Sequence, residues 1–290
     1  MKENKKILVT GASGQLGRSF QSLTEVFDNL EFVFTDVEFL DITNIQSVNE
    51  VFSTEKPNYC INCAAYTLVD KAEENVELNN RINIDGPKNL AHACKDFNAK
   101  LIHISSDYVY NGFDQNVVFA EDDYLNPLSV YAKSKLEGEL QIKKYLSDYM
   151  IFRTSWLYSE YGNNFVKTIL KYSKERDELK VVNDQEGSPT YAIDLAHDIL
   201  KILARDDFQN GIYNYSNEGF VSWFEFAKEI VDYSNINCKI LPIATKDYPT
   251  AAKRPLNSKM SKQKFITSFN IPMKKWQESL HICINNLKKS

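Results

Sequence analysis

The sequence predicts an α/β fold: a doubly wound parallel sheet covered by helices on both faces, followed by a smaller C-terminal α/β region. Two observations support this prediction. Short β-branched and apolar runs alternate with segments of helical periodicity through the first half of the chain. The glycine-rich stretch GASGQLG lies between the first of these runs and the first helical segment. Strands separated by helices are expected to be parallel and joined by right-handed crossovers, which gives the doubly wound arrangement.

Apolar runs and their periodicity place the individual elements. In the first half, strands are expected at 6–10, 32–34, 59–63, 101–104 and 150–153, and helices at 15–28, 45–52, 71–97 and 130–147. In the second half, helices are expected at 163–175, 191–204, 222–234 and 272–288, separated by turn-rich pieces at 185–190, 214–219 and 246–257. We therefore expect a first domain over 1–150 that also includes parts of 185–215, and a second region over 151–290.

The composition is typical of a soluble globular protein and argues against several classes. Hydrophobic residues make up 43% of the chain and charged residues 25%, and the formal net charge is -5. This charge argues against binding nucleic acid through a basic surface. The five cysteines are scattered, so we expect free thiols in a reducing compartment. No apolar run is long enough for a signal peptide or a membrane span, which predicts a cytoplasmic protein with no membrane partner.

The GASGQLG stretch predicts a phosphate-binding loop, because it follows a strand and opens a helix. Gly11 permits a tight turn, Gly14 lets the backbone approach a pyrophosphate, and Gly17 lets the helix pack closely on the strand. The helix N-terminus then presents backbone N–H groups and the positive end of its dipole to the phosphates. The first domain is therefore predicted to bind a dinucleotide, and the second region to bind the substrate.

Asp36 ends the second predicted strand, where an acidic side chain can accept hydrogen bonds from the adenosine ribose hydroxyls. A carboxylate there favours NADH over NADPH, because it would repel a 2′-phosphate. Arg18 lies close in the sequence and would offset that repulsion, and a solvated loop acid is the alternative for Asp36. The choice between NADPH and NADH therefore stays open.

Tyr131 and Lys135 have the YxxxK spacing at the start of a predicted helix, so they share one helical face, one turn apart. A tyrosine with an ordinary pKa near 10 is a poor proton relay at neutral pH. A neighbouring ammonium stabilises the phenolate and brings the tyrosine toward a useful working pKa. The same ammonium can hold the nicotinamide ribose.

Two further segments give the YxxxK pair its chemical context. Ser106 ends a buried strand, and ligands bind at the carboxyl ends of strands in an open parallel sheet. Its hydroxyl can then hydrogen-bond a substrate carbonyl beside Tyr131. The stretch 63–67, CAAYT, ends the preceding strand with small residues, over which a cofactor can lie. Together these features predict a hydride-transfer site.

No pattern in the sequence predicts a metal site. Cys60 and Cys63 form a single CxxC inside an apolar strand, without a second pair. The four histidines lack metal-ligand spacing, and His103 alternates with apolar residues on a strand, which is typical of a packed histidine.

Six segments spread along the chain resemble one known family. GASGQLG, NCAAYTLVDKAEE, SSDYVYNG, YAKSKLEGE, RTSWLY and DQEGSPT together closely resemble the dTDP-4-dehydrorhamnose reductases, within the extended short-chain dehydrogenase/reductase family. The likeness runs from residue 6 to the RPLNS segment at 254–258. It implies a Rossmann-like fold and reduction of the 4-keto group of a dTDP-linked 4-keto-6-deoxy sugar to dTDP-L-rhamnose by NADPH or NADH. It also implies a homodimer, in some members with bound Mg²⁺.

The resemblance assigns roles to residues of this chain. The family's catalytic threonine, tyrosine and lysine correspond to Ser106, Tyr131 and Lys135, and its substrate contacts to Ser106, Asp107, Tyr131 and Trp156. Together with the glycine loop, the expected coenzyme contacts are Gly11, Ser13, Gly14, Gln15, Leu16, Gly17, Asp36, Asp41, Ile42, Ala64, Ala65, Tyr66, Thr67, Tyr131 and Lys135. Trp156 could instead be a core residue. Arg254, in a proline-containing loop, is expected to contact the diphosphate of the substrate, with a solvated loop as the alternative.

Two departures from the family pattern and two alternative functions remain. Serine stands at position 106 where threonine is usual, and it keeps the hydroxyl while losing the methyl that restricts χ1. Tyr66 stands where many members have histidine. The alternatives are another sugar-nucleotide reductase or epimerase, and a non-catalytic regulatory subunit like that of methionine adenosyltransferase. Asp107-Tyr108 after Ser106 argues against a 4,6-dehydratase, which usually has Asp-Glu there.

Overall fold

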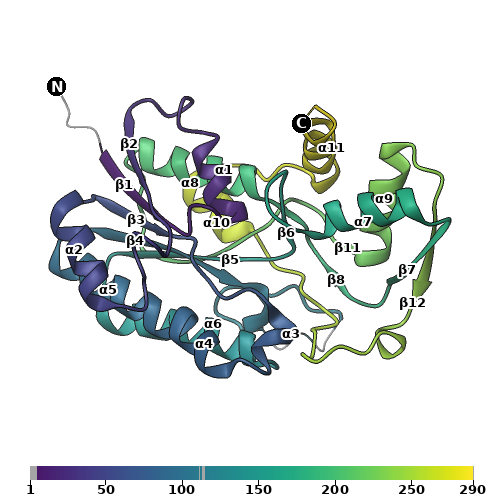
Figure 1. The fold of residues 1–290 in the computed structure, drawn as a ribbon, viewed down its shortest axis with the longest axis horizontal. Coiled ribbons are helices and arrows are strands. Elements are labelled where there is room, and N and C mark those ends of the chain that lie inside the picture. The colour runs from purple at the N-terminus through teal and green to yellow at the C-terminus, as the bar shows by residue number, and fades with distance from the viewer. Residues whose placement is uncertain (1–4, 111, 113–114, 290) are drawn as a thin grey trace.

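A six-stranded parallel sheet forms the centre of the protein (Figure 1). The computed structural model describes residues 5–110, 112 and 115–289. The strands are β1 (Lys5–Thr10), β2 (Leu30–Phe34), β3 (Tyr59–Asn62), β4 (Lys100–Ser106), β5 (Tyr149–Thr154) and β10 (Gly211–Tyr215), in the spatial order β10-β5-β4-β3-β1-β2. Every neighbouring pair is parallel. The predicted doubly wound α/β fold is confirmed.

The strand order reverses between β1 and β3. From β1 the chain first moves outward to β2, then returns to place β3 on the other side of β1. Thr10 at the end of β1 is level with Asn62 at the end of β3, and Ser106 at the end of β4 is level with Thr154 on β5. The carboxyl ends of these strands therefore share one edge, and ligands of open parallel sheets bind outside that edge, at the reversal.

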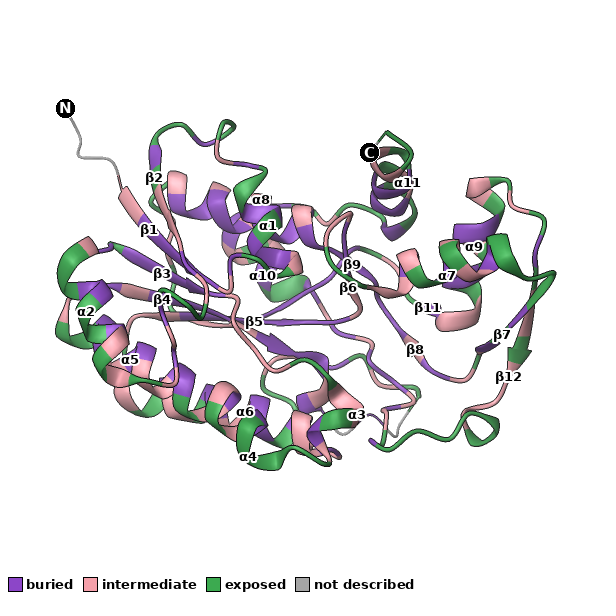
Figure 2. Cartoon of the chain, in the orientation of Figure 1, coloured by how far each residue is buried: buried purple, intermediate pink, exposed green. Residues whose placement is uncertain are grey.

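Helices cover both faces of the sheet. One face carries α2 (Ile45–Glu55), α5 (Gly86–Asp96) and α6 (Val130–Tyr145), and the other carries α1 (Gln15–Gln21), α8 (Ala192–Ala204) and α10 (Gln263–Phe269). Leu8, Cys60 and Leu101 face the first set, while Ile7 and Ile102 face the second. The central strands β3, β4 and β5 are almost entirely buried, whereas the edge strand β2 is mostly half-buried (Figure 2). Burial on both faces explains why the central strands occur in the sequence as nearly continuous apolar runs.

The last strand of the sheet was not predicted. The sequence analysis assigns 214–219 to a turn-rich piece, whereas Gly211–Tyr215 is β10, with Tyr215 level with Thr154 of β5. Its GIYNY sequence has no continuous apolar run. Tyr213 and Tyr215 instead alternate with Asn214 and pack on Phe152 and Phe265 of the core. The C-terminal half of the chain therefore completes the N-terminal sheet, and the division near residue 150 stays a prediction.

The helix predicted over 71–97 is divided in the structure. It comprises α3 (Val69–Ala72), α4 (Val76–Asn80), a π-helical turn (Arg81–Asp85) and α5. The buried Asn83 lies in the π-helical turn, and its amide hydrogen-bonds the backbone of Tyr66. The irregular turn therefore places a buried amide where it satisfies the backbone groups of a neighbouring loop. The first predicted helix, 15–28, is also shorter, since α1 ends at Gln21 and turns follow.

The remaining elements form a second, smaller unit beside the carboxyl edge of the sheet. Its helices are α7 (Phe165–Glu175), α9 (Trp223–Ser234) and α11 (Trp276–Leu287), and its paired strands are β6 (Leu157–Tyr158) with β9 (Thr190–Tyr191), β7 (Glu178–Val182) with β12 (Lys239–Ile243), and β8 (Glu186–Gly187) with β11 (Val221–Ser222). Short 3₁₀ helices span Asp107–Val109 and Thr245–Asp247. The four helices predicted in the second half are confirmed, with ends shifted by a few residues.

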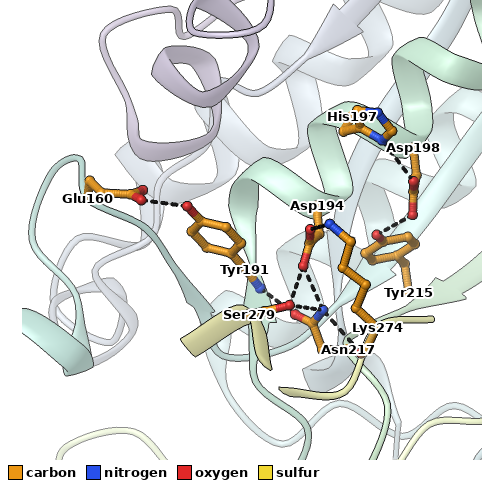
Figure 3. Close-up of polar contacts among 9 residues, drawn as sticks. All are labelled: Glu160, Tyr191, Asp194, His197, Asp198, Tyr215, Asn217, Lys274 and Ser279. Atoms are coloured by element: carbon orange, nitrogen blue, oxygen red, sulfur yellow. Dashed lines mark hydrogen bonds and ion pairs between the residues drawn. The ribbon is translucent and has the colours of Figure 1, made fainter. Parts of the chain in front are cut away.

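A buried polar cluster fastens the C-terminal helix to α8 (Figure 3). The Asp194 carboxylate on α8 accepts hydrogen bonds from Asn217 Nδ2 at 2.9 Å and Ser279 Oγ at 2.5 Å, and pairs with Lys274 Nζ at 2.6 Å. The Tyr191 N–H donates to Asn217 Oδ1 at 2.7 Å. The side chain of Asp194 is 5% exposed. Elements distant in the sequence therefore meet at a single carboxylate.

Replacing Asp194 with alanine is expected to lower the free energy of unfolding by about 3 kcal/mol, because the buried Ser279 hydroxyl loses its acceptor, Asn217 Nδ2 loses one acceptor and Lys274 loses its ion-pair partner. Urea unfolding at unchanged m-value measures this loss. The matched control is Lys274→Ala. Lys274 is 55% exposed, so losing its charge alone is expected to cost less than about 1 kcal/mol. Equal losses in the two variants would contradict the assignment of the main contribution to the buried donors.

Three further features of the structure concern its cysteines, its helices and the side-chain types that bind metals. All five cysteines are free, and four of them are buried. Within the described residues, no helix combines the length and the apolar character needed to cross a bilayer. The same residues contain no group of three or more His, Cys, Asp or Glu side chains arranged to hold a metal ion.

Candidate active site

The glycine loop packs against the end of β3 so closely that side chains are excluded. Gly11 has φ +62°, and a Cβ on it would lie 2.7 Å from the backbone nitrogen of Ala64. A Cβ on Gly17 would lie 2.4 Å from the carbonyl oxygen of Gly11. At Gly14, the N-cap of α1, no described side chain caps the helix. The loop therefore has the exposed backbone and the tight turn that a dinucleotide pyrophosphate requires.

Asp36 lies beside the glycine loop. Its Oδ2 accepts a hydrogen bond from the Ser13 N–H at 3.0 Å, and the N–H of Ala12 donates to the Thr35 carbonyl at 3.0 Å. These bonds hold the end of β2 against the loop, where an acid can reach a ribose. Arg18 is exposed on α1. The roles assigned to Asp36 and Arg18 in the choice of coenzyme stay predictions.

Two of the predicted coenzyme contacts are core residues. Leu16 is 5% exposed and packs with α8, and Ile42 is 4% exposed and packs over Gly86. Only their backbone groups are therefore available to a ligand. Asp41 lies in an open polar hollow of about 580 Å³ between α2 and α5, and its Oδ1 accepts from the Thr43 N–H at 2.9 Å.

Asn83 holds the segment 64–67, which follows β3, in place through two hydrogen bonds to the backbone of Tyr66. The Tyr66 N–H donates to Asn83 Oδ1 at 2.9 Å, and Asn83 Nδ2 donates to the Tyr66 carbonyl at 3.0 Å. Asn83 also donates to Ser134 Oγ at 3.1 Å, on α6 one turn after its start. Asn83 was not predicted, because a polar residue inside an apparently regular helix gives no signal in the sequence.

Ser106, Tyr131 and Lys135 converge at the end of β4. Ser106 Oγ donates to Asp107 Oδ1 at 2.9 Å and accepts from the Tyr108 N–H at 3.2 Å. Lys135 Nζ donates to the carbonyl of Ile104, two residues before Ser106, at 2.7 Å. Because Tyr131 lies one turn before Lys135, this bond brings its phenol toward Ser106. The structure therefore brings the three predicted residues together, and their catalytic roles stay predictions.

Burial sets the protonation of this site. It raises the pKa of Tyr131 to about 12, although a hydrogen bond to Ser106 acts in the opposite direction. The lowering of this pKa that the sequence analysis expects from Lys135 is therefore not found in the coenzyme-free site. Burial lowers the pKa of Lys135 to about 8, and the negative charge of Glu139 opposes that fall. At neutral pH Tyr131 is therefore a neutral phenol able to give a proton, and most Lys135 carries its charge.

Asp107 is a buried acid beside the hydroxyl of Ser106. The residue is 4% exposed, and burial raises its pKa to about 6 in spite of hydrogen bonds from Ser258 and Ser106. Its Oδ2 has no hydrogen-bond partner among the described residues. A buried carboxylate with a free oxygen is suited to accept hydrogen bonds from a polyhydroxylated ligand.

Replacing Asp107 with asparagine is expected to stabilise the ligand-free protein at pH 7 by roughly 2–3 kcal/mol. Because the folded pKa is raised, the unfolded chain releases this proton first, and stability is lost as pH rises from about 4 to about 6. The neutral amide avoids that loss, so the advantage should vanish below about pH 4. Thermal unfolding across this range measures it, with the exposed Asp122→Asn as control; an equal gain at pH 4 and pH 7 would contradict the argument.

A cavity of about 730 Å³ opens in the second unit, and Tyr108, two residues after Ser106, forms part of its wall. Tyr108, Phe165, Trp223, Tyr248 and Arg254 are among its lining residues. Aromatic rings and a guanidinium suit a ligand that has both a flat ring and phosphate groups.

Arg254 and Trp156 are both engaged with other side chains. Arg254 donates Nη1 and Nη2 to the two carboxylate oxygens of Asp70, at 3.0 and 2.6 Å. Asp70 was not predicted, although it belongs to the AAYTLVDKAE segment. Trp156 has φ +48° and stacks on Trp223 with ring centroids 3.6 Å apart. Trp223 lines the cavity, so Trp156 supports its wall.

Comparison with known proteins agrees with this geometry. The model of the RmlD substrate binding domain family matches residues 5–289. A dTDP-4-dehydrorhamnose reductase of Aggregatibacter actinomycetemcomitans is 42% identical over 286 residues, covering 95% of this chain and 97% of the relative. The chain belongs to the dTDP-4-dehydrorhamnose reductase family.

Solved structures of dTDP-4-dehydrorhamnose reductases share the whole fold. The Clostridium acetobutylicum protein superposes with a TM-score of 0.92 at 44% identity, covering 98% of this chain and 99% of that one. The Bacillus anthracis protein, solved in complex with NADP, gives 0.93 at 40% identity with the same coverage. The resemblance inferred from six short segments is confirmed, and with it the prediction of an NAD(P)H-dependent oxidoreductase.

Two buried residues that the sequence analysis missed lie next to Lys135 and Ser106 on α6 and β5. Glu139 and Arg153 form an ion pair at 2.7 Å in which both side chains are 1% exposed. Glu139 follows Lys135 by four residues, as Lys135 follows Tyr131. The spacing that indicated the pair Tyr131/Lys135 could therefore have indicated a third member of the same helical face.

Proposed function

We propose that the protein reduces the 4-keto group of dTDP-4-dehydro-L-rhamnose to give dTDP-L-rhamnose, with NAD(P)H as reductant and Tyr131 as proton donor. The observation that carries this proposal is the convergence of Ser106, Tyr131 and Lys135 beside the glycine loop and the cavity. The proposal is supported by similar proteins that are named dTDP-4-dehydrorhamnose reductase, one of which has a crystal structure in complex with NADP.

The residues around the glycine loop fit a dinucleotide. The close packing of Gly11 on Ala64 and of Gly17 on Gly11 fixes the tight turn, and the N-terminus of α1 at Gly14 has no cap from a described side chain, so its backbone N–H groups can meet a pyrophosphate. Asp36 is placed for the adenosine ribose and Lys135 for the nicotinamide ribose. When bound, the coenzyme supplies the hydride that adds to the carbonyl carbon of the sugar.

Tyr131 performs the proton transfer in the proposed reaction. Its neutral phenol donates a proton to the carbonyl oxygen, which becomes the hydroxyl oxygen of the product. The Lys135 ammonium stabilises the phenolate that remains, since opposite charges attract strongly in a buried site. The Ser106 hydroxyl donates a hydrogen bond to the same substrate oxygen and holds it in line.

The cavity beside Tyr131 is proposed to hold the dTDP portion of the substrate. Arg254 would contact the diphosphate, with Asp107 contacting the sugar and Trp156 stiffening the wall behind Trp223. We further propose that residues 151–290 supply most of this substrate region, and that the protein acts as a homodimer in the cytoplasm.

Oxidation of NADPH and NADH should be followed at 340 nm with dTDP-4-dehydro-L-rhamnose, with the product identified by mass spectrometry and NMR. The proposal predicts turnover only when the keto sugar is present. Coenzyme that stays bound through purification, with interconversion of dTDP-sugars instead, would identify an epimerase. Tight coenzyme binding without any turnover would identify a non-catalytic subunit.

A further inference from the structure

Glu139 and Arg153 form a buried ion pair that the proposed reaction does not use. Arg153 donates Nε to Glu139 Oε1 at 3.0 Å and Nη2 to Oε2 at 2.7 Å. Ser105 Oγ donates to Glu139 Oε1 at 2.5 Å. On its other side, Arg153 Nη1 donates to the hydroxyl of Tyr110 at 3.0 Å and to the carbonyl of Glu121 at 2.9 Å.

The pair connects α6 and β4, which carry Tyr131, Lys135 and Ser106, with the neighbouring strand β5. Tyr131, Lys135 and Glu139 are spaced by four residues on α6, so they lie along one face of the helix. Ser105 directly precedes Ser106 on β4, and Arg153 is level with Ser105 on β5. The hydrogen bonds of the Glu139 carboxylate therefore fix the position of α6 along its axis relative to β4, the strand that ends in Ser106.

Stability alone does not account for this arrangement. Removing two charges from water costs about as much as their attraction returns, and an apolar pair of similar volume is often equally stable. A buried ion pair instead favours one relative position of the two elements that carry it, because its two parallel hydrogen bonds form only in that position.

We propose that Glu139 is a positioning residue of the proposed reductase: held by Arg153 and Ser105, it sets the alignment of Tyr131 with Ser106 and keeps a negative charge one turn from the Lys135 ammonium. This inference rests on the proposed function.

The charges around Lys135 support the electrostatic part of the proposal. The elements packed around α6 carry several titratable groups, which include Tyr131 and Glu139 on α6 itself, His103 on β4, Arg153 on β5, and Asp107 and Tyr108 in the 3₁₀ turn. Burial, and then the Lys135 ammonium, lower the pKa of His103, so that His103 is neutral. Of these groups, Glu139 is the one whose charge raises the pKa of Lys135.

The variants are chosen to separate alignment from charge. Glu139→Gln removes the charge but leaves Arg153 buried without its partner, which could prevent folding. The double variant Glu139→Gln/Arg153→Met removes both charges and keeps the volume, and it is the principal test. Ser105→Ala keeps the ion pair and removes only its bond to β4.

Lys135 is measured directly in coenzyme-free protein, from the pH titration of its ¹³Cε resonance, assigned by its loss in Lys135→Met. The double variant is expected to lower the titration midpoint by roughly one pH unit, because an opposite charge one turn away is lost. The alkaline limb of kcat should move by the same amount. Ser105→Ala is expected to lower kcat about 5-fold at unchanged KM, without moving either midpoint.

The inference would be overturned by two results together. In the folded double variant, the Lys135 midpoint and kcat would have wild-type values, and in Ser105→Ala kcat would also have its wild-type value. That result leaves the proposed function intact if the wild-type protein reduces the keto sugar. Conversely, a wild-type protein without turnover refutes the proposed function, while the Lys135 titration still reports on Glu139.

Discussion

Replacing Tyr131 with phenylalanine is expected to lower kcat for reduction of dTDP-4-dehydro-L-rhamnose by about 1000-fold, because a positioned general acid contributes on this scale. The ring that packs edge-on against Tyr108 is retained, so the fold and the cavity should be unchanged. Steady-state kinetics gives kcat, and quenching of protein fluorescence gives the dissociation constant of NADPH, which should stay within about 3-fold of wild type.

The matched control is Tyr158→Phe. The Tyr158 hydroxyl is buried, with no hydrogen-bond partner among the described residues, and its ring packs on Tyr191 and Phe226 in the second unit. Deleting that hydroxyl should leave kcat unchanged. Full activity in Tyr131→Phe would refute Tyr131 as proton donor, and a comparable loss in both variants would point to a general loss of structure.

Replacing Gly17 with alanine is expected to weaken coenzyme binding by roughly 100-fold and to destabilise the coenzyme-free protein. The added Cβ would lie 2.4 Å from the Gly11 carbonyl oxygen and 2.5 Å from Ala12 Cα. Both are backbone atoms, which no side-chain rotation can move, so the whole loop must shift. A displacement of about 1 Å in a binding loop is enough for a loss of this size. Fluorescence titration with NADPH and thermal unfolding measure the two effects.

Gly14→Ala separates packing from phosphate approach. The backbone at Gly14 has φ -72°, which alanine adopts freely, and its Cβ would meet only the Gly11 carbonyl oxygen, at 3.1 Å. We therefore expect weaker coenzyme binding with nearly wild-type thermal stability. If Gly17→Ala were as stable as Gly14→Ala, the close packing inferred for the loop would be wrong.

The parts of the site that follow from local sequence were predictable. The glycine spacing, the YxxxK spacing and the hydroxyl at the end of a strand each depend on a few neighbouring residues and on a known periodicity. Ser106, Tyr131 and Lys135 could therefore be assigned to one site before any coordinates. The same reasoning gave the alternation of strands and helices, which determines the sheet up to β5.

The parts that depend on distant pairs were not predictable. Arg254 meets Asp70 across more than 180 residues, and no local pattern links a loop arginine to a helical aspartate. Glu139 and Arg153 resemble any helical glutamate and any strand arginine until the fold buries them together. Asn83 breaks a helix only because its amide has Tyr66 as a partner.

The sixth strand of the sheet has a consequence for synthesis of the chain. Strand β5 is complete at residue 154, but its open edge is covered only by β10 at 211–215, and Phe152 meets Phe265 of α10 later still. During translation the nascent chain therefore exposes the unpaired edge of β5 until β10 follows more than 50 residues later, and exposes the apolar surface around Phe152 until Phe265 follows more than 100 residues later. A fragment ending at residue 150 would keep the glycine loop yet lack the covering of its own core. The two halves of the chain are thus joined in one sheet and one hydrophobic core.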